Sequence, residues 1–302
     1  MASEAQHPNL VIYPKISVVV PTLNAERRLE RLFNMLKAQT LQPSEIVVVD
    51  SSSDDNTAKL AADLGAMVVT IKRCEFNHGM TRHRALLSTN GDYVAFLTDD
   101  AVPANKDYLK HLAAALEDET VGMASGRQIP RSDARRFEAL VRGFNYPGTS
   151  FVRSINDIER LGIRTFFASD VCSIYRRTAY MQCGGFQAVE TNEDMLMAAK
   201  MIQSGWKIAY EASAEVIHSH NLTPLEQYRR NKAAGRFLEE RRSDLMNASE
   251  LGEGMKLVHG VGKALFEERR FMELASFGID CIARLAGNRV GRREARKSLC
   301  EK

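Results

Sequence analysis

Apolar strand patterns that alternate with amphipathic helix patterns constrain the fold of this chain more than any other feature. Residues 16–20 form a mostly β-branched run, and residues 45–50 repeat the pattern with four consecutive apolar side chains. Such runs are typical of strands buried on both faces of a parallel sheet. Between them, residues 26–39 carry leucine and phenylalanine at helical spacing. The opening of the chain therefore predicts a βαβ unit.

The same alternation continues as far as residue 97. A helix pattern over residues 54–64 precedes a strand pattern over 67–71, and a second helix over 79–88 precedes a strand over 93–97. Strands that alternate with helices in this way predict an α/β fold with a doubly wound, mainly parallel central sheet.

The rest of the chain is less regular. Residues 133–167 are polar and aromatic without strong periodicity, which predicts a mobile segment that faces the substrate. From residue 224 onward the pattern is almost entirely helical and carries several basic clusters. The remaining expected elements are a helix over 108–116, a strand over 121–127, a strand over 171–175, a helix over 194–204 and a strand over 206–209.

Composition excludes several classes of protein. The net charge is only +3, from 41 basic and 38 acidic side chains, so the chain lacks the strong field of a dedicated nucleic-acid binder. Five scattered cysteines predict free thiols in a reducing compartment. Residues 1–10 lack the apolar core of a secretory signal, and no apolar run approaches the ~20 residues that span a bilayer. We expect a cytoplasmic location, with peripheral attachment to the inner face of the cell membrane as an open alternative.

Polar residues follow the predicted strands at the edge where ligands bind in open parallel sheets. The first strand ends in Pro-Thr-Leu-Asn at residues 21–24, the second in Asp50 and three serines, and the fourth in Thr98-Asp99-Asp100. Neither a Gly-x-Gly-x-x-Gly motif nor a Gly-Lys-Thr/Ser loop follows the first strand, which argues against dinucleotide and P-loop chemistry.

The adjacent carboxylates Asp99 and Asp100 predict a metal site. Mg²⁺ and Mn²⁺ prefer oxygen ligands and commonly bridge one or two carboxylates to substrate phosphates. A polar turn in which an aspartate caps the next helix is the alternative reading of this pair.

In this order, the strand-end motifs resemble those of the family 2 glycosyltransferases, which have the GT-A nucleotide-diphospho-sugar transferase fold. The resemblance covers residues from about 15 to about 235. It implies a GT-A domain over 12–235, with a nucleotide-sugar-binding half over 12–103 and an acceptor and catalytic half over 104–235. A basic helical extension over 236–302 follows it.

The resemblance also assigns roles to single residues. Thr98-Asp99-Asp100 stands where the family has Asp-x-Asp, so Asp100 is the expected metal ligand and Asp99 a neighbour that faces the donor. The remaining roles are contact with the nucleotide for Pro21, Thr22, Asn24 and Glu26, and contact with its base and ribose for Asp50 and Ser51.

A narrower similarity is to the rhamnosyltransferase branch of this family. It rests on Phe-Asn-His-Gly at residues 76–79, on Thr-Arg at 81–82, and on residues 98–103. It implies dTDP-L-rhamnose as the donor. His78 can donate to a phosphate or a sugar hydroxyl, Gly79 permits close approach of the backbone, and Arg82 adds positive charge. A simple helix cap by Asn77 is the alternative.

Glu193 and Asp194 are the expected catalytic pair. An inverting transfer needs one carboxylate that takes the proton from the acceptor hydroxyl. The family has a Glu-Asp element here whose aspartate is the expected base, so we predict Asp194 as the base and Glu193 as its orienting neighbour. The alternative is that both acids only favour the start of a helix.

Two late histidines complete the predicted site. His218 and His220 point to the same side of an extended chain, and an imidazole here can ligate the metal or bond a diphosphate oxygen. Either could be the ligand. Arg230 lies where the branch has a basic segment and could neutralise the leaving diphosphate, although a solvated helix face explains it equally well.

Together these observations predict an inverting glycosyltransferase that uses Mg²⁺ or Mn²⁺ and passes L-rhamnose to a saccharide or lipid-linked glycan of a cell-surface polysaccharide. Alternatives are a transferase with a UDP- or GDP-sugar donor, or a non-catalytic partner of a polysaccharide assembly complex that binds sugar nucleotides. The basic C-terminal helices could lie on anionic lipid, or pack as a cap or a homodimer surface.

Overall fold

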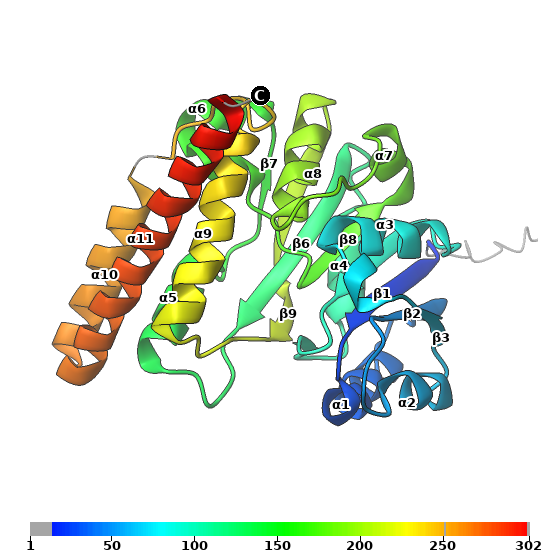
Figure 1. Ribbon diagram of the computed structural model, residues 1–302. Coiled ribbons are helices and arrows are strands. Elements are labelled where there is room, and N and C mark those ends of the chain that lie inside the picture. The colour runs from blue at the N-terminus through cyan, green and yellow to red at the C-terminus, as the bar shows by residue number, and fades with distance from the viewer. Residues whose placement is uncertain (1–13, 251, 301–302) are drawn as a thin grey trace, which may run out of the picture.

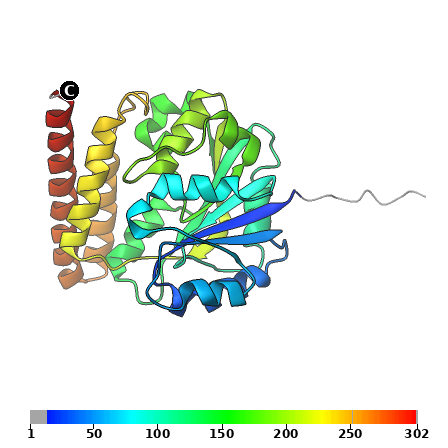
Figure 2. The same cartoon turned by 45° about the vertical axis from the view of Figure 1, so that its right-hand side comes forward.

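The computed structural model describes residues 14–250 and 252–300. Residues 1–10, predicted above to lack a secretory signal, lie outside the described residues, as does the predicted domain start at residue 12. A nine-stranded sheet forms the centre of the molecule, with helices on both of its faces (Figures 1 and 2).

The first half of the chain builds the parallel part of the sheet. Strands β1, β2, β3 and β4 lie in the order β3-β2-β1-β4, and all three pairings are parallel. This arrangement confirms the alternation of strands and helices predicted for the first hundred residues. The elements are β1 (Ile16–Thr22), α1 (Glu26–Lys37), β2 (Glu45–Asp50), α2 (Thr57–Asp63), β3 (Met67–Thr70), α3 (His78–Leu87), β4 (Tyr93–Leu97) and the short β5 (Val102–Pro103).

The second half makes the sheet mixed. Strand β8 lies antiparallel between β4 and β6, β9 lies parallel to β6, and β5 and β7 pair antiparallel with β9. The elements are α4 (Tyr108–Ala114), β6 (Val121–Ile129), α5 (Arg136–Asn145), β7 (Phe151–Arg153), α6 (Ile158–Leu161), β8 (Cys172–Arg176), α7 (Arg177–Gln182), α8 (Glu193–Gln203), β9 (Lys207–Ile217) and α9 (Pro224–Glu240).

Two more helices, α10 (Glu253–Glu267) and α11 (Phe271–Cys300), complete the predicted helical extension. Figures 1 and 2 both show α9, α10 and α11 grouped at one side of the sheet, away from α1 and α2. Among the described helices, none combines the length and the apolar character that a membrane span requires.

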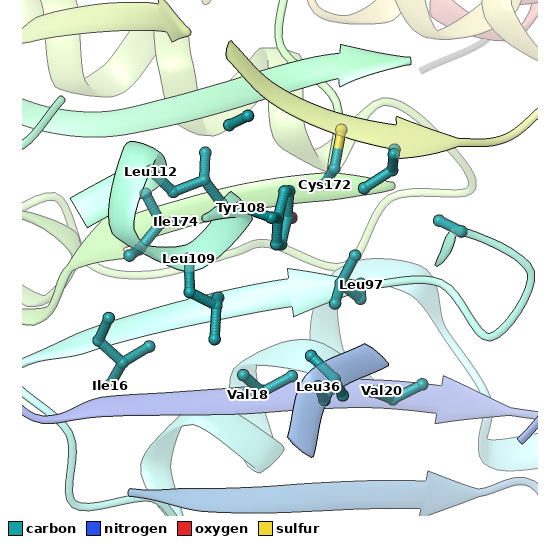
Figure 3. Close-up of a cluster of buried hydrophobic side chains, with 14 of the residues drawn as sticks. Ile16, Val18, Val20, Leu36, Leu97, Tyr108, Leu109, Leu112, Cys172 and Ile174 are labelled. Atoms are coloured by element: carbon teal, nitrogen blue, oxygen red, sulfur yellow. The ribbon is translucent and has the colours of Figure 1, made fainter. Parts of the chain in front are cut away.

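The hydrophobic core lies on both faces of the sheet because side chains alternate along each strand. Ile16, Val18 and Val20 of β1 point toward one face, where Figure 3 shows them with Leu36 of α1 and Tyr108 of α4. Val19, which points the other way, belongs to a second cluster on the opposite face. A separate, smaller cluster joins α5 to the C-terminal helices, through Phe137, Val141, Val261, Leu265 and Phe277.

The prediction of an irregular, mobile segment over residues 133–167 is wrong, because the segment contains helix α5. The buried face of α5 carries two charged side chains, Glu138 and Arg142, beside Phe137 and Val141. Their side chains form an ion pair of 2.8 Å within the helix. Phe137, Leu140, Val141 and Phe144 recur at helical spacing, so the sequence does contain the pattern of this helix, which the expectation of an irregular segment overlooked.

Strand β9 is also much longer than the predicted strand over 206–209. It continues to Ile217 and pairs with β6 along most of its length. Its later residues include exposed and charged side chains, which hide the strand in the sequence. The longer strand places His218 and His220 directly at its carboxyl end.

Candidate active site

The predicted site residues gather at one edge of the sheet. The carboxyl ends of β1, β2, β4, β6 and β9 lie there because these strands run in the same direction. Strand β8 runs in the opposite direction, so its amino end lies at this edge, with Leu97 opposite Cys172. The topology therefore brings together residues from most of the chain.

A cleft of about 610 Å³ opens at this edge. Its wall contains residues from the ends of β1, β2 and β4, from the start of α3, and from the segment that follows β9. The predicted site residues that line the cleft are Pro21, Thr22, Ser51, His78, Arg82, Asp99, Asp100, His218, His220 and Arg230.

Three of the predicted nucleotide contacts, Asn24, Glu26 and Asp50, do not line the cleft. Their side chains instead form hydrogen bonds within and between the loops around it. The carboxylate of Asp50 accepts hydrogen bonds from the backbone and the hydroxyl of Ser53. Asn24 accepts from the Asp54 backbone through its side-chain oxygen, and the Glu26 carboxylate accepts from Asn56. They fix the turn after β2 against the start of α1, and their contact with a nucleotide stays a prediction.

Gly79 does not line the cleft either. A Cβ at this position would lie 2.2 Å from the carbonyl oxygen of Gln187, so the missing side chain lets α3 approach the loop before α8. The close approach is thus to this chain's own backbone, which corrects the predicted approach to a ligand. Asn77 accepts a hydrogen bond from the Met80 backbone at 3.0 Å, so the helix cap weighed above is present. It coexists with His78 in the wall of the cleft.

Asp100, His218 and His220 form a group that could hold a metal ion. Oδ2 of Asp100 lies 3.5 Å from Nε2 of His218 and 3.3 Å from Nε2 of His220. Ligands about 2.1 Å from one octahedral ion stand roughly 3 Å apart, so this spacing fits a shared ion. Burial alone would raise the pKa of Asp100, but the hydrogen bond and charge of His218 hold that pKa well below its ordinary value.

Gln128, at the end of β6, orients one of these imidazoles. Its Oε1 lies 3.0 Å from Nδ1 of His218. A bound ion would require a neutral His218: with its proton on Nδ1 and donated to Gln128, Nε2 would offer its lone pair to the ion instead of donating to Asp100. Gln128 is not among the residues predicted from the sequence, although it directly follows the predicted strand over 121–127, at the same edge as the strand-end residues of β1, β2 and β4.

Asp99 and Asp100 face different partners. Oδ2 of Asp99 forms an ion pair of 2.6 Å with Nη2 of Arg28, which also donates to the Asn24 carbonyl. Burial raises the pKa of Asp99 in spite of this pair. Asp99 thus links β4 to α1, while Asp100 faces the two histidines.

A second cavity, of about 380 Å³, adjoins the first. Its wall includes Glu193 and Asp194 at the start of α8, Asp170 before β8, and residues of α5, α9 and α11. The residues common to both cavities are His78, Arg82, Thr98, Val171, Thr191, His218, His220 and Arg230. The candidate metal group therefore stands where the two cavities meet.

Three carboxylates lie close together in this second cavity. Oδ2 of Asp194 accepts a hydrogen bond of 3.1 Å from the Asp170 backbone, and its Oδ1 accepts from the Met195 backbone. Glu193 is buried and pairs with Arg82 at 3.0 Å. Asn192, in the left-handed region at φ +61°, turns the chain into α8 so that both acids occupy its first turn.

The family model "Glycosyl transferase family 2" matches residues 17–184, more than half of the chain. This chain belongs to that family. The resemblance proposed from its motifs is therefore confirmed, and the protein is a glycosyltransferase.

Two relatives of this glycosyltransferase are O-antigen chain rhamnosyltransferases of Salmonella. The O-antigen chain rhamnosyltransferase WbaN of Salmonella anatum is 42% identical over 227 residues, which cover 74% of this chain and 72% of the relative. The O-antigen chain rhamnosyltransferase RfbN of Salmonella typhimurium strain LT2 is also 42% identical, with the same coverage.

Solved structures show the same GT-A fold at low sequence identity. The mannosyltransferase PcManGT of Pyrobaculum calidifontis, in complex with GDP-Man and Mn²⁺, matches with a TM-score of 0.62 and 16% identity over 93% of this chain and 89% of that one. Residues 1–349 of TarS from S. aureus match with a TM-score of 0.53 and 18% identity over 94% and 92%. The predicted fold class is confirmed.

The electrostatics of this glycosyltransferase make Asp194 a strong proton acceptor. Burial raises its pKa well above the ordinary value, and the negative charges of Glu193 and Asp170 raise it further. Burial also raises the pKa of Asp170 to about 6. Oδ1 of Asp170 accepts from Ser173 and Tyr175, while its buried Oδ2 has no partner among the described residues.

Arg230 and Arg229 differ in position. Arg230 lines both cavities, whereas Arg229 lines neither. Within the described part of the chain, no hydrogen bond or ion pair engages the Arg230 guanidinium. Both arginines are exposed, but only Arg230 lies where it could reach a diphosphate, and its contact with one stays a prediction.

Proposed function

We propose that this enzyme is an inverting rhamnosyltransferase that transfers L-rhamnose from dTDP-L-rhamnose to a saccharide or lipid-linked glycan in the synthesis of a cell-surface polysaccharide. The observation that carries the proposal is the pair of adjoining cavities with Asp100, His218 and His220 at their junction. The names of the two 42% identical relatives support rhamnose and polysaccharide synthesis.

The first cavity would hold the donor. Ser51, which follows β2, lines it, and its hydroxyl is buried without a partner among the described residues, so a side-chain rotation would let it bond a nucleotide. Arg230 would bond the diphosphate that leaves. Basic donors that are already in place stabilise negative charge as it develops.

Asp100, His218 and His220 would hold the divalent metal. One carboxylate oxygen and two imidazole nitrogens suit Mn²⁺ better than Mg²⁺, which prefers oxygen ligands alone. When bound, the ion supplies positive charge that neutralises the leaving diphosphate. Gln128 would keep His218 in the ligating orientation.

Asp194 would act as the base from the second cavity. Its carboxylate accepts the proton of the acceptor hydroxyl as that oxygen bonds the anomeric carbon, while the bond from this carbon to the diphosphate oxygen breaks. Attack from the side opposite the leaving group inverts the configuration. Glu193 would hold Arg82 in place through their ion pair. Arg82 lines both cavities, so it lies between the proposed donor and acceptor positions.

The first test is calorimetric binding of dTDP, UDP and GDP, each with Mn²⁺, with Mg²⁺ and without a metal. We expect dTDP to bind at least about tenfold more tightly than UDP and GDP, and only with a divalent metal present, because the diphosphate needs a bridging cation. Tighter binding of UDP or GDP than of dTDP would show that the donor is a UDP-sugar or a GDP-sugar and not dTDP-L-rhamnose. Binding of none of the three would contradict the donor assignment.

We also propose a cytoplasmic enzyme held at the membrane by the turn between α10 and α11. Phe266, Phe271 and Met272 leave 62%, 56% and 84% of their surfaces exposed there. Arg269, exposed between them, has no ion-pair partner among the described residues. Large apolar side chains beside an unpaired cation favour the interface of an anionic bilayer.

Co-sedimentation with vesicles tests this attachment. We expect binding to phosphatidylglycerol vesicles and little binding to phosphatidylcholine vesicles. The double variant Phe271→Glu, Met272→Glu should bind the former at least about tenfold more weakly, because it loses apolar burial worth about 1.5–3 kcal/mol per side chain. Met181→Glu, an exposed apolar residue on α7, is the control. Equal binding by all three proteins would refute the attachment, and a wild-type dimer that the double variant splits would identify a homodimer surface instead.

A further inference from the structure

Helix α11 reaches into the second cavity, although it lies about a hundred residues beyond the catalytic pair in sequence. Arg284, in the middle of α11, lines this cavity and not the first one. From α9, Gln227, Asn231 and Ala234 line the same wall. The C-terminal extension is therefore part of the wall of this cavity, beside residues of the predicted acceptor and catalytic half over 104–235.

Three glycines bring α11 this close to α9. A Cβ on Gly287 would lie 2.3 Å from the Tyr228 carbonyl oxygen, and one on Gly291 would lie 1.9 Å from that of Lys232. A Cβ on Gly235 of α9 would likewise meet the Asn288 carbonyl oxygen at 2.3 Å. Since no side chain fits between the two backbones, the position of Arg284 against the cavity is fixed by helix packing.

Arg284 is held by one nitrogen and leaves its others available. Its Nε donates to Oδ2 of Asp280 at 2.6 Å, and Asp280 is buried with 4% of its surface exposed. Gln227 also donates to this oxygen, at 3.5 Å. Within the described residues, nothing bonds the two terminal nitrogens of Arg284, whose side chain is 28% exposed. The ion pair with Asp280 holds the guanidinium in place, and its two terminal nitrogens have no acceptor among the described residues.

The charges of the second cavity are separated. Arg82 and Arg142 are neutralised by Glu193 and Glu138, at 3.0 and 2.8 Å. The cations on α9 and α11, Arg230 and Arg284, have free donors. On the side of β8 and α8, by contrast, Asp170 and Asp194 form no ion pair with a described residue, although the charge of Arg82 acts on Asp170.

We propose that Arg284 binds a phosphate group of the acceptor and so selects acceptors that carry one. This inference rests on the proposed function, in which the second cavity holds the acceptor and Asp194 takes the proton of its hydroxyl. A guanidinium fork matches the oxygens of a phosphate, and charge-assisted hydrogen bonds to it are strong. We assign the phosphate to the acceptor because Arg284 lines the same cavity as Asp194, the proposed base.

Inorganic diphosphate is the probe that tests this assignment. Its binding is measured calorimetrically on the full chain with Mg²⁺ in excess and saturating dTDP, which occupies the first cavity. We expect Arg284→Ala to weaken diphosphate binding roughly 10- to 100-fold, since charged hydrogen bonds are lost, and Arg284→Lys to restore part of it. Arg293→Ala is the matched control, because Arg293 is an exposed arginine of α11 that lines neither cavity.

Equal diphosphate affinity in wild type, Arg284→Ala and Arg293→Ala would overturn the assignment, as would the absence of diphosphate binding to wild type. The dTDP affinity of each variant, measured in the same titrations, separates this result from a failure of the proposed function. Loss of dTDP binding in wild type would reject the donor assignment. Loss of dTDP binding in Arg284→Ala alone would show that the substitution disturbs the fold, and Arg284→Lys would then decide the question.

Discussion

Replacing Asp194 by asparagine should lower kcat for sugar transfer by about 10²- to 10⁴-fold, the range over which a general base contributes. The substitution keeps the shape of the side chain and one acceptor oxygen, so it can retain one of the two hydrogen bonds from the Met195 and Asp170 backbones, but it removes the group that takes up the proton. Affinity for dTDP should stay within about twofold, because Asp194 does not line the donor cavity. Initial rates of transfer and calorimetry on the same preparations check both statements.

Asp107→Asn is the matched control for this experiment. Asp107 is a half-buried aspartate at the start of a helix, α4, and lies in the wall of neither cavity. It should keep nearly full activity. A kcat for Asp194→Asn within a factor of ten of wild type would exclude Asp194 as the base and favour the alternative that its charge only stabilises the start of α8.

The pH dependence of transfer follows from the same carboxylate. A base must be ionised to accept a proton, and the pKa of Asp194 is raised, so activity should increase as the pH rises through that pKa. Asp170→Asn removes a neighbouring negative charge, which should lower the pKa of Asp194 and move the acidic limb down by about one pH unit. An unchanged limb would show that Asp170 has only a structural role.

The sequence predicts the donor side of this site well because that side depends on local rules. Each strand of the first half ends in polar residues, and the parallel topology places these ends together. Residues such as Ser51 and Asp100 reach the cleft for this reason alone. The same rule fails to tell which polar residue faces outward: Asp50 bonds its own loop, and Ser51 beside it lines the cleft.

The acceptor side is harder to predict because long-range packing builds it. Helix α5 carries the ion pair of Glu138 and Arg142 beside its apolar residues, and the apolar spacing does not show that these two charged side chains line the cavity. Arg284 enters the cavity only because glycines of α9 and α11 permit close contact of two helices. Neither periodicity nor motif spacing contains that information.

Tertiary contacts give the two adjacent carboxylates Asp99 and Asp100 different partners and therefore different roles. Arg28 of α1 neutralises Asp99, while His218 and His220, which follow β9, face Asp100. The partner of Asp99 lies 71 residues away in the sequence. The partners of Asp100 follow β9, a strand near the end of the sheet opposite β3. The sequence alone leaves both acids as candidates, and the geometry favours Asp100.

Asp100→Ala should therefore weaken metal-dependent dTDP binding by roughly 100-fold or more. Loss of a residue that only supports a ligand already costs about 10- to 100-fold in metal affinity, and Asp100 is the one carboxylate of the proposed ligand set. Calorimetric titration with Mn²⁺ alone, and with dTDP in the presence and absence of Mn²⁺, measures the effect. In the variant, the difference between the two dTDP titrations should nearly vanish.

Asp99→Ala is the contrast that makes this prediction specific. It removes an equal charge from the same turn but breaks the pair with Arg28 instead of the group with the two histidines. Because a carboxylate bound to an arginine is not available to an ion, Mn²⁺ affinity should fall less than tenfold. If both variants lose Mn²⁺ affinity equally, the turn supplies general negative charge and no defined ligand. If only Asp99→Ala loses it, the ion lies against α1, and the two histidines serve the acceptor.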